Sequence, residues 1–298
     1  MTAKVIFNPY SNRWKAGELR STVEAELKSA GIEFEVVTTE RRFHGTELTV
    51  TAVKEGFSPI IAAGGDGTIG EVINGLFQAQ GDGKLGPLGI LPLGTANDLV
   101  HNIKAPLDLV EAVRVIAGGK TRLMDIIGLN GMVFGNNSGI GLEPYVTTIE
   151  KKMKHLKGLL RYLTAALLGI KDNPHWKVTM EWDGGEYKGP ASLVSVGNGA
   201  VTGGLFYMAP HADPFDGKLT FLMGHRGSRL GALQLLPKLM QPEGNVVHEK
   251  DVMEVHATRL KIHLDRPAPA HMDGELFPDW MQDFEYSIFP AKLQVLVK

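Results

Sequence analysis

Residues Ile60–Thr68 read Ile-Ile-Ala-Ala-Gly-Gly-Asp-Gly-Thr, an apolar run that leads directly into a glycine-rich turn carrying one carboxylate. The run is typical of a buried strand, and apolar residues continue at helical spacing from Ile69 to Phe77. A strand, a glycine turn and a helix in this order present backbone N–H groups and a helix N-terminus to a phosphate. The Asp66 carboxylate would repel a phosphate unless a divalent cation or a proton lay between them. The motif therefore predicts a nucleotide site with Mg²⁺.

Two better-known phosphate-binding motifs are absent from the sequence. It contains no Gly-x-x-x-x-Gly-Lys-Ser/Thr loop. The segments Gly139–Gly141 and Gly197–Gly199 lack the third glycine and the strand–helix context of a dinucleotide fingerprint. Taken alone, Gly64–Thr68 is also compatible with an ordinary tight turn between a strand and a helix.

Composition narrows the class of protein. A chain of 298 residues is long for a single core, so we expect two domains. A net charge of −2 argues against nucleic acid as a partner, because a nucleic-acid binder needs a basic field. The absence of cysteine excludes disulfides and thiolate chemistry and fits a reducing cytoplasm. With no signal-peptide pattern and no apolar run long enough to span a membrane, we expect a cytoplasmic protein. The sequence is compatible with an oligomer.

The first 125 residues alternate strand-like and helix-like segments, which predicts an α/β nucleotide-binding domain with a doubly wound parallel sheet. Ligands of such sheets bind beyond the carboxyl ends of the strands, where both Gly64–Thr68 and Gly94–Asp98 lie. The expected strands are Val5–Phe7, Phe34–Thr38, Pro59–Ala63 and Leu88–Leu91, and the expected helices Glu18–Ala30, Glu47–Glu55 and Leu109–Ala117.

Residues 126–298 show the pattern of an antiparallel, β-rich, sandwich-like domain. Turn signals at Asn130-Gly131 and Asp183–Gly185 predict hairpins, the second between strands Lys177–Trp182 and Tyr187–Val196. Further strands are expected at Lys218–Met223, Arg259–Leu264 and Phe284–Phe289, with a last strand, Leu293–Val297, that can return to the first domain.

One predicted helix, Lys151–Lys171, interrupts the β pattern. Its apolar residues recur every three or four positions, and its first half carries Lys151, Lys152, Lys154, Lys157 and Arg161. Such a helix is suited to the surface of an anionic membrane. A helix that covers the β domain and exposes a solvated basic face is the alternative, which composition alone favours.

Together with Gly89–Asp98, the glycine turn resembles the diacylglycerol kinase catalytic-domain family, which includes bacterial lipid kinases and sphingosine kinases. The resemblance spans essentially the whole chain. Further segments match in order and at similar spacing: Asn8–Ser11, Glu71–Gly75, Phe134–Gly141, Asp213–Leu219 and His271–Glu275. The resemblance implies an ATP- and Mg²⁺-dependent lipid kinase that acts on diacylglycerol or a related lipid alcohol and meets it transiently at a membrane surface. It also implies that residues 126–298 form the lipid-substrate domain.

The resemblance also implies roles for individual residues. Asp66, Asp273 and Glu275 are implied to be catalytic, with Glu275 favoured as the base. We expect Asp273 and Glu275 to lie on one face of a strand, because strand side chains alternate. The implied contacts to ATP are Asn8, Pro9, Tyr10, Ser11, Asn12, Thr39, Gly64, Gly65, Asp66, Gly67, Thr68, Ile69, Gly70, Glu71, Gly94, Thr95 and Asn97.

Two groups of oxygen ligands are predicted for magnesium. Asp66, Asp98 and Asp125 are expected to form a carboxylate cluster that organises the catalytic Mg²⁺. Asp213, Asp216 and Lys218 are implied to hold a structural Mg²⁺, because an acidic Asp-x-x-Asp-Gly turn suits a hard cation. His271 is expected to be a supporting or surface residue.

Two departures from the family pattern and two alternative functions stay open. The family often has asparagine where Gly70 lies, and serine–glycine where Ser11-Asn12 lies. An NAD kinase shares the glycine motif but differs from this chain at Pro92–Asp98. A non-catalytic nucleotide-binding regulatory protein is the other alternative, and retention of all five candidate carboxylates argues against it.

Overall fold

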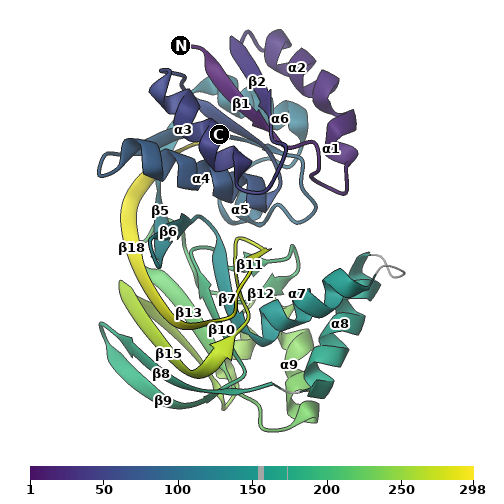
Figure 1. Ribbon diagram of the computed structural model, residues 1–298, viewed down its shortest axis with the longest axis vertical. Coiled ribbons are helices and arrows are strands. Elements are labelled where there is room, and N and C mark those ends of the chain that lie inside the picture. The colour runs from purple at the N-terminus through teal and green to yellow at the C-terminus, as the bar shows by residue number, and fades with distance from the viewer. Residues whose placement is uncertain (154–157, 173) are drawn as a thin grey trace.

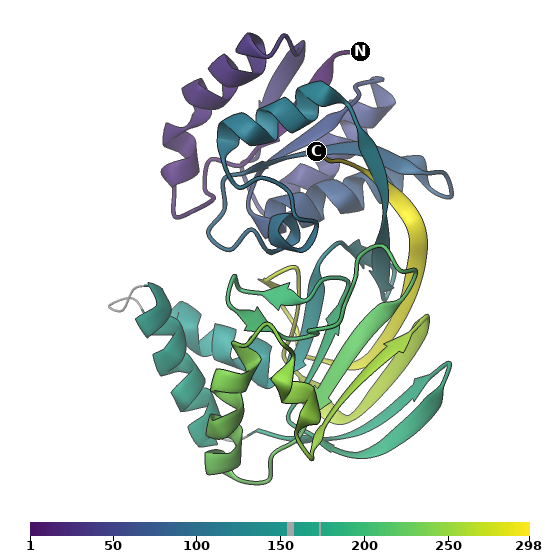
Figure 2. The same cartoon turned by 180° about the vertical axis from the view of Figure 1, so that it is seen from behind.

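A computed structural model describes residues 1–153, 158–172 and 174–298 of the chain. It has two lobes with a band of strands running from one to the other (Figure 1). The upper lobe in this view contains both termini, and the lower lobe contains most of the antiparallel strands. Figure 2 shows the same division from behind.

The N-terminal lobe is a parallel sheet with helices on both faces, as the sequence predicts. Its strands are ordered β2-β1-β3-β4, all parallel. The strands are β1 (Ala3–Phe7), β2 (Phe34–Thr38), β3 (Ile60–Gly64) and β4 (Leu85–Pro92), and the helices are α1 (Lys15–Glu18), α2 (Arg20–Ser29), α3 (His44–Lys54), α4 (Asp66–Gln80), α5 (Asp98–Asn102) and α6 (Leu109–Gly118).

Alternation along the central strands explains this layering. Ile6, Ile60 and Ala62 pack on one face with the core residues of α3, α4 and α5. Ile61 and Ala63 point to the other face, where they pack with residues of α2 and α6. A strand that is buried on both faces has no polar side, and this accounts for the uniformly apolar run that precedes Gly64.

Two long strands continue from the N-terminal lobe into the C-terminal lobe. They are β5 (Thr121–Leu129) and β18 (Met281–Leu296), and they pair antiparallel along most of their length. At its C-terminal end, β18 also pairs in parallel with β4. The boundary expected at residue 125 therefore falls inside β5. The sequence also divides β18 into two strands, whereas the structure has one strand with an irregularity between Phe289 and Leu293, where Ala291 is left-handed.

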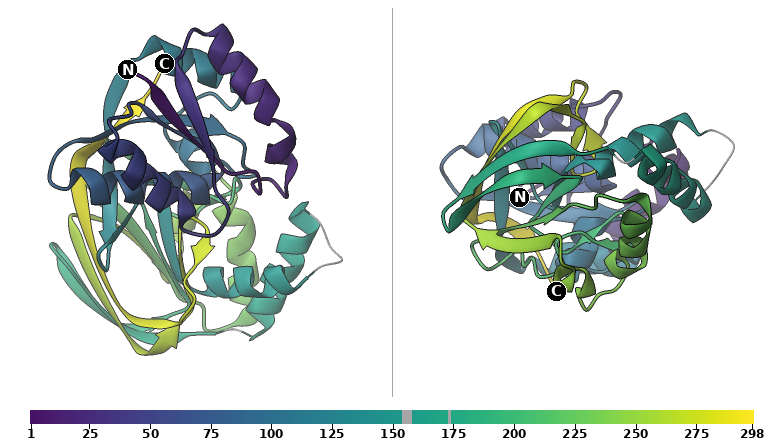
Figure 3. Two further views of the ribbon diagram at one scale, coloured as in Figure 1. Left: turned by 45° about the horizontal axis from the view of Figure 1, so that its top comes forward. Right: turned by 90° about the horizontal axis from the view of Figure 1, so that it is seen from below.

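The C-terminal lobe packs two antiparallel sheets around one apolar core, which confirms the predicted β-rich fold. Figure 3 shows this layering from above and below. One sheet continues β18 through β15 (Arg259–Ala268), β8 (Trp176–Trp182) and β9 (Gly185–Ala191). The other is ordered β14 (Val252–Ala257), β13 (Leu219–Gly224), β10 (Leu193–Gly197), β7 (Asn137–Gly141), β16 (Ala270–Met272) and β17 (Glu275–Leu276). The remaining elements are β6 (Met132–Phe134), β11 (Val201–Thr202), β12 (Phe206–Tyr207), α9 (Arg229–Leu239) and a 3-10 helix at Asn245–His248.

Two predicted elements of this lobe are wrong. The single strand expected over Tyr187–Val196 is two strands, because the chain leaves the first sheet after Ala191 and enters the second at Leu193. The single helix expected over Lys151–Lys171 is two helices, α7 (Leu142–Lys152) and α8 (Gly158–Asp172), which pack against each other. Lys154 and Lys157 of the predicted basic face lie outside the described residues. In the part of the chain that is described, no helix has both the length and the apolar character needed to cross a membrane.

Candidate active site

A cleft of about 1030 Å³ lies between the two lobes. One end is lined by the loops that follow β1, β2, β3 and β4, at the carboxyl edge of the parallel sheet. The other end is lined by α7, β7 and the β11–β12 hairpin. The carboxylates of Asp66, Asp98, Asp273 and Glu275 line the same cleft.

The glycine turn joins β3 to α4 with one intervening residue, Gly65. A Cβ atom on Gly94 would lie only 2.5 Å from the Cα of Gly65, so the two glycine loops touch through their backbones. A 15-residue helix therefore directs its N-terminus into the cleft with no side chain in the way at Gly65 or Gly67. This arrangement suits a phosphate group, which the helix dipole and the free N–H groups favour.

The loop after β1 packs against this turn. The Asn8 side chain donates to the Thr68 hydroxyl at 2.9 Å, and the Ser11 hydroxyl accepts from the Gly65 N–H at 3.2 Å. Asn12, Arg13 and Trp14 all adopt the left-handed conformation, which folds the loop back over the end of the sheet. Asn12 is one of the departures from the family pattern, and its side chain accepts from the Thr95 hydroxyl at 3.3 Å.

The structure brings most of the predicted nucleotide contacts to one end of the cleft. The lining residues among them are Asn8, Tyr10, Ser11, Asn12, Thr39, Gly65, Asp66, Gly67, Thr68, Glu71, Gly94 and Thr95. Pro9, Gly64, Ile69, Gly70 and Asn97 are not part of that lining. Ile69 is fully buried in the core, and Asn97 instead accepts a hydrogen bond from the Gly94 N–H at 3.0 Å.

Asp66, which is half-buried, and Asp98, which is buried, form an acidic pair in the cleft. Asp66 accepts from the Leu99 N–H at 3.2 Å, and Asp98 accepts from the N–H groups of Gly203 and Gly204 at 2.6 Å each. Burial raises the pKa of Asp66, and burial together with the charge of Asp66 raises the pKa of Asp98 to about 7. Two carboxylates that repel each other in this way fit a bound divalent cation, which would favour the charged form of both.

Asp125 does not belong to this cluster, which corrects the prediction. Its carboxylate accepts from the N–H groups of Gly217 and Ala291 at 2.6 Å each, away from the cleft lining. Burial and the charges of Asp216 and Asp213 raise its pKa. Sequence spacing could not show this, because Asp125 lies in the middle of β5 and meets the Asp213–Lys218 turn only through the fold.

The Asp213–Lys218 turn is compact and closed by its own acidic side chains. Asp213 accepts from the Phe215 N–H at 3.0 Å, and Asp216 accepts from the Lys218 N–H at 2.9 Å. Among the residues that the structure describes, no group of three or more acidic or histidine side chains is arranged to hold a metal ion. A structural Mg²⁺ at this turn would therefore depend on backbone carbonyl oxygens together with Asp216.

The Asp216→Ala variant tests this ion site. We expect a lower melting temperature and weaker activity, with ATP binding retained, because the turn closes next to β5 and β18 rather than at the cleft. An ion that binds only the folded state, at a free concentration one hundred times its Kd, adds about 2.7 kcal/mol to the free energy of unfolding. Removal of Mg²⁺ should therefore lower the melting temperature of the wild type more than that of the variant. Asp279→Ala, at an exposed aspartate, is the matched control. Equal Mg²⁺ shifts in the wild type and Asp216→Ala would contradict the site.

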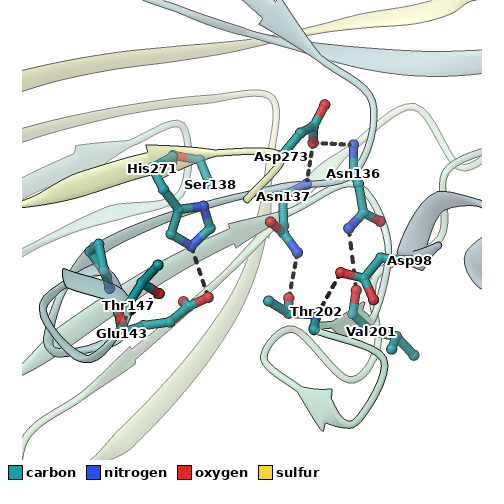
Figure 4. Close-up of polar contacts among 12 residues, drawn as sticks. Asp98, Asn136, Asn137, Ser138, Glu143, Thr147, Val201, Thr202, His271 and Asp273 are labelled. Carbon is teal, nitrogen blue, oxygen red and sulfur yellow. Dashed lines mark hydrogen bonds and ion pairs between the residues drawn. The ribbon is translucent and has the colours of Figure 1, made fainter. Parts of the chain in front are cut away.

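Asp273 and Glu275 both reach the cleft, but not as neighbours on one strand face. Asp273 and Gly274 have positive φ and form the turn between β16 and β17. Asp273 is buried and accepts from the N–H groups of Gly135, Asn136 and Asn137 at 3.0 to 3.2 Å (Figure 4). Burial raises the pKa of Asp273 to about 6, although the three backbone hydrogen bonds act to lower it.

Glu275 is in a different environment. Its side chain is 48% exposed and lies 3.5 Å from the Arg42 guanidinium. A Cβ atom on Gly67 would lie 3.2 Å from its Oε1 atom, so the carboxylate adjoins the first turn of α4. Of the two residues, Glu275 has the freer carboxylate, since three backbone donors occupy Asp273.

His271 is buried, so of the two expectations, a supporting or a surface residue, the surface position does not hold. Its Nε2 atom is paired with Glu143 Oε1 at 2.8 Å, and Figure 4 shows the pair beside Asn137 and Asp273. Burial alone would lower the pKa of His271, but the charge and hydrogen bond of Glu143, with the charges of Asp273 and Asp98, raise it. The pairing with Glu143 therefore favours the protonated form of His271 next to the acidic centre.

Sequence reasoning did not single out several of the side chains that line the cleft, four charged ones among them. Arg13, Arg41 and Arg42 lie at its nucleotide end, and Glu143 at the other. Arg41 and Arg42 follow the carboxyl end of β2, the edge of the sheet at which ligands bind. This position is the one signal that could have indicated the two arginines. The position of Glu143 depends on how α7 packs against β7, and no local pattern reports that contact.

Comparison with known proteins agrees with this geometry. Residues 2–129 match the model of the diacylglycerol kinase catalytic domain, and residues 137–297 match that of the YegS C-terminal NAD kinase beta sandwich-like domain. The chain belongs to the diacylglycerol kinase catalytic-domain family. The resemblance found in the sequence is thus confirmed, and the second match shows that this family member carries a YegS-type C-terminal domain.

Relatives of this family member match along nearly their whole length. It is 28% identical over 275 residues to the diacylglycerol kinase of Bacillus subtilis, covering 92% of this chain and 89% of the relative. It is 27% identical over 274 residues to the diacylglycerol kinase of Staphylococcus carnosus, covering 92% and 88%. A crystal structure of a diacylglycerol kinase from Bacillus anthracis superposes with a TM-score of 0.79 at 22% identity, covering 100% of this chain and 97% of the other, which shows the shared fold.

Proposed function

We propose that this protein is a lipid kinase that transfers the γ-phosphate of ATP to the hydroxyl group of a lipid alcohol, with Mg²⁺ as the cofactor. Membership of the family supports a kinase, and relatives along the whole chain are named diacylglycerol kinases. The observation that carries the proposal is the cleft itself, in which a glycine-bounded helix N-terminus faces four carboxylates. Phosphoryl transfer needs this combination of phosphate positioning, charge neutralisation and a base.

The residues divide this work between the two lobes. The first turn of α4 and the loops at Asn8–Asn12 and Gly94–Thr95 would bind and orient the phosphates of ATP. Asp66 and Asp98 would hold Mg²⁺, which supplies charge neutralisation on the phosphate oxygens when it is bound. The buried Asp273 fixes the backbone of residues 135–137 and keeps a carboxylate beside this pair.

Glu275 is the proposed base. It would accept the proton of the lipid hydroxyl as that oxygen attacks the γ-phosphorus, and Arg42 at 3.5 Å would orient the carboxylate. Diacylglycerol or a related lipid alcohol is the proposed acceptor. The site would be presented to the lipid at a membrane surface.

Phosphate transfer to matched acceptors tests this function. Purified protein, labelled ATP and Mg²⁺ are incubated with diacylglycerol, a sphingoid base, a polyprenol and NAD in separate reactions. We expect label on a lipid alcohol, no label on NAD, and loss of transfer when Mg²⁺ is chelated. Label on NAD alone would contradict a lipid kinase, and ATP binding without transfer to any acceptor would favour a regulatory protein.

A further inference from the structure

A second cavity, of about 310 Å³, lies along one side of helix α4 next to the cleft. The start of α3, the turn before β6 and the end of β16 form its other walls, through residues that include Phe43, Met132 and Met272. The residues contributed by α4 recur every three or four positions and so form one face of the helix. They are Gly67, Gly70, Glu71, Asn74, Phe77 and Gln78. We call this cavity the α4 groove.

Three polar side chains in the walls of the α4 groove, Glu47, Glu71 and Asn74, are already bonded within the protein. Glu71 accepts from two backbone N–H groups at the start of α3, at 2.8 Å each. Asn74 is bonded to both the carbonyl and the N–H of Val133, and Glu47 is paired with Arg41 through both carboxylate oxygens. These groups therefore need no hydrogen bond from a ligand. Between them the groove presents Phe43, Phe77, Met132 and Met272, which suits an apolar chain.

The groove opens at the carboxylates of the active site. Gly67, Glu71, Asp273 and Glu275 line both the groove and the cleft. A Cβ atom would lie 3.2 Å from Glu275 Oε1 if added to Gly67, and 2.9 Å from Asp273 Oδ2 if added to Gly70. Glycine at position 70, where the family often has asparagine, thus keeps this passage clear. The α4 groove is continuous with the point at which a hydroxyl group would meet its base.

The position of the nucleotide limits where an acceptor can enter. The attacking and leaving oxygens lie roughly in line on opposite sides of the transferred phosphorus. If ATP occupies the loops that follow the parallel strands, the α4 groove gives an acceptor a path to Glu275 that does not cross those loops. We propose that the α4 groove holds the apolar chain of the lipid alcohol, with its hydroxyl at Glu275. This inference rests on the proposed function and specifies how the substrate is recognised.

A neighbouring cavity extends the path. It has a volume of about 320 Å³, shares Phe77, Gly131 and Met132 with the α4 groove, and reaches Arg259 and Lys261 at its far side. A long chain can therefore continue past Phe77, whereas a short chain would end inside the first cavity. Selection by chain length follows from this geometry, because each methylene that is buried contributes a factor of about four to binding.

Filling the groove tests the inference in the full-length protein. Gln78→Trp adds bulk at an exposed position that lines the groove, and Met132→Trp adds it at the opposite wall. Lys54→Trp, on the exposed end of α3 outside both cavities, is the matched control. Melting curves confirm that each variant folds. kcat/KM is then measured for alcohols that share one headgroup and differ only in chain length.

We expect both groove variants to lose at least about tenfold in kcat/KM for long-chain acceptors and much less for short-chain ones, since a long chain must pass the added ring and a short chain fills less of the groove. Lys54→Trp should follow the wild type at every length. An unchanged dependence on chain length in folded groove variants would overturn the inference.

Photo-crosslinking separates this inference from the proposed function, because it needs no catalysis. A long-chain alcohol with a diazirine at the end of its chain is bound without ATP, and the labelled peptides are identified. We expect label at residues 77–78 or 131–133. Label confined to α7, α8 or α9 would overturn the groove even if lipid phosphorylation is observed. Label in the groove without phosphorylation of any lipid would leave the groove standing and refute the kinase.

Discussion

The Glu275→Gln variant is expected to be nearly inactive, with kcat reduced by roughly a hundredfold or more, while ATP and Mg²⁺ titrations stay those of the wild type. Glutamine keeps the shape of the side chain but cannot take the proton of the attacking hydroxyl. Because Glu275 is half exposed and its carboxylate is paired with the exposed Arg42 side chain, the substitution should leave the melting temperature nearly unchanged. Steady-state kinetics with calorimetry of ATP binding checks both parts of this expectation.

Asp273→Asn is the matched comparison for Glu275→Gln. An asparagine amide would turn a donor toward backbone N–H groups that now donate to Asp273, and an unpaired buried polar group costs about 1–3 kcal/mol. We expect a lower melting temperature and a shifted Mg²⁺ titration for Asp273→Asn, in contrast to Glu275→Gln. The reverse pattern would exchange the two roles, and near-normal turnover in both variants would remove this turn from the mechanism.

The Gly67→Val variant is expected to lose ATP binding. Position 67 lies in the first turn of α4, where the backbone must approach a phosphate closely, and a side chain there also meets Glu275 at 3.2 Å. Activity could fall because the new side chain meets either the phosphate or Glu275, so calorimetry of ATP binding is the decisive measurement. The C-terminal lobe has its own apolar core and should stay folded.

Ala79→Val is the control for Gly67→Val, because it adds the same side chain to α4 outside the cleft lining. It should bind ATP as the wild type does. Unchanged ATP affinity in a folded Gly67→Val protein would place the nucleotide elsewhere.

The N-terminal lobe could be predicted from sequence because its signals are local. The apolar run before Gly64 is buried on both faces, and the glycines that follow are required by the contact between Gly65 and Gly94. Alternation of such strands with helices is sufficient to predict a parallel sheet. The nucleotide end of the cleft follows from the same rule, since it lies at the carboxyl ends of these strands.

The errors arose where long-range contacts decide the outcome. Whether β18 is one strand or two depends on its pairing with β5, β15 and β4, which lie far away in the chain. Asp66 lies in the glycine turn and Asp125 within β5, and only the fold shows that their carboxylates face different parts of the molecule. Asp273-Gly274 is a dipeptide typical of turns, but we expected a strand at this position. The structure has a turn there.

Recovery of label in the lipid phase tests the central claim most directly. The wild type and Glu275→Gln are incubated side by side with γ-labelled ATP, Mg²⁺ and a dispersed long-chain lipid alcohol, and the organic extract is counted after equal times. The proposed function predicts phosphorylated lipid with the wild type and almost none with Glu275→Gln, at equal ATP occupancy of the two proteins. Equal label from both proteins would contradict the assigned base. No label in the lipid phase from the wild type with any lipid alcohol, with ATP bound, would contradict the kinase itself.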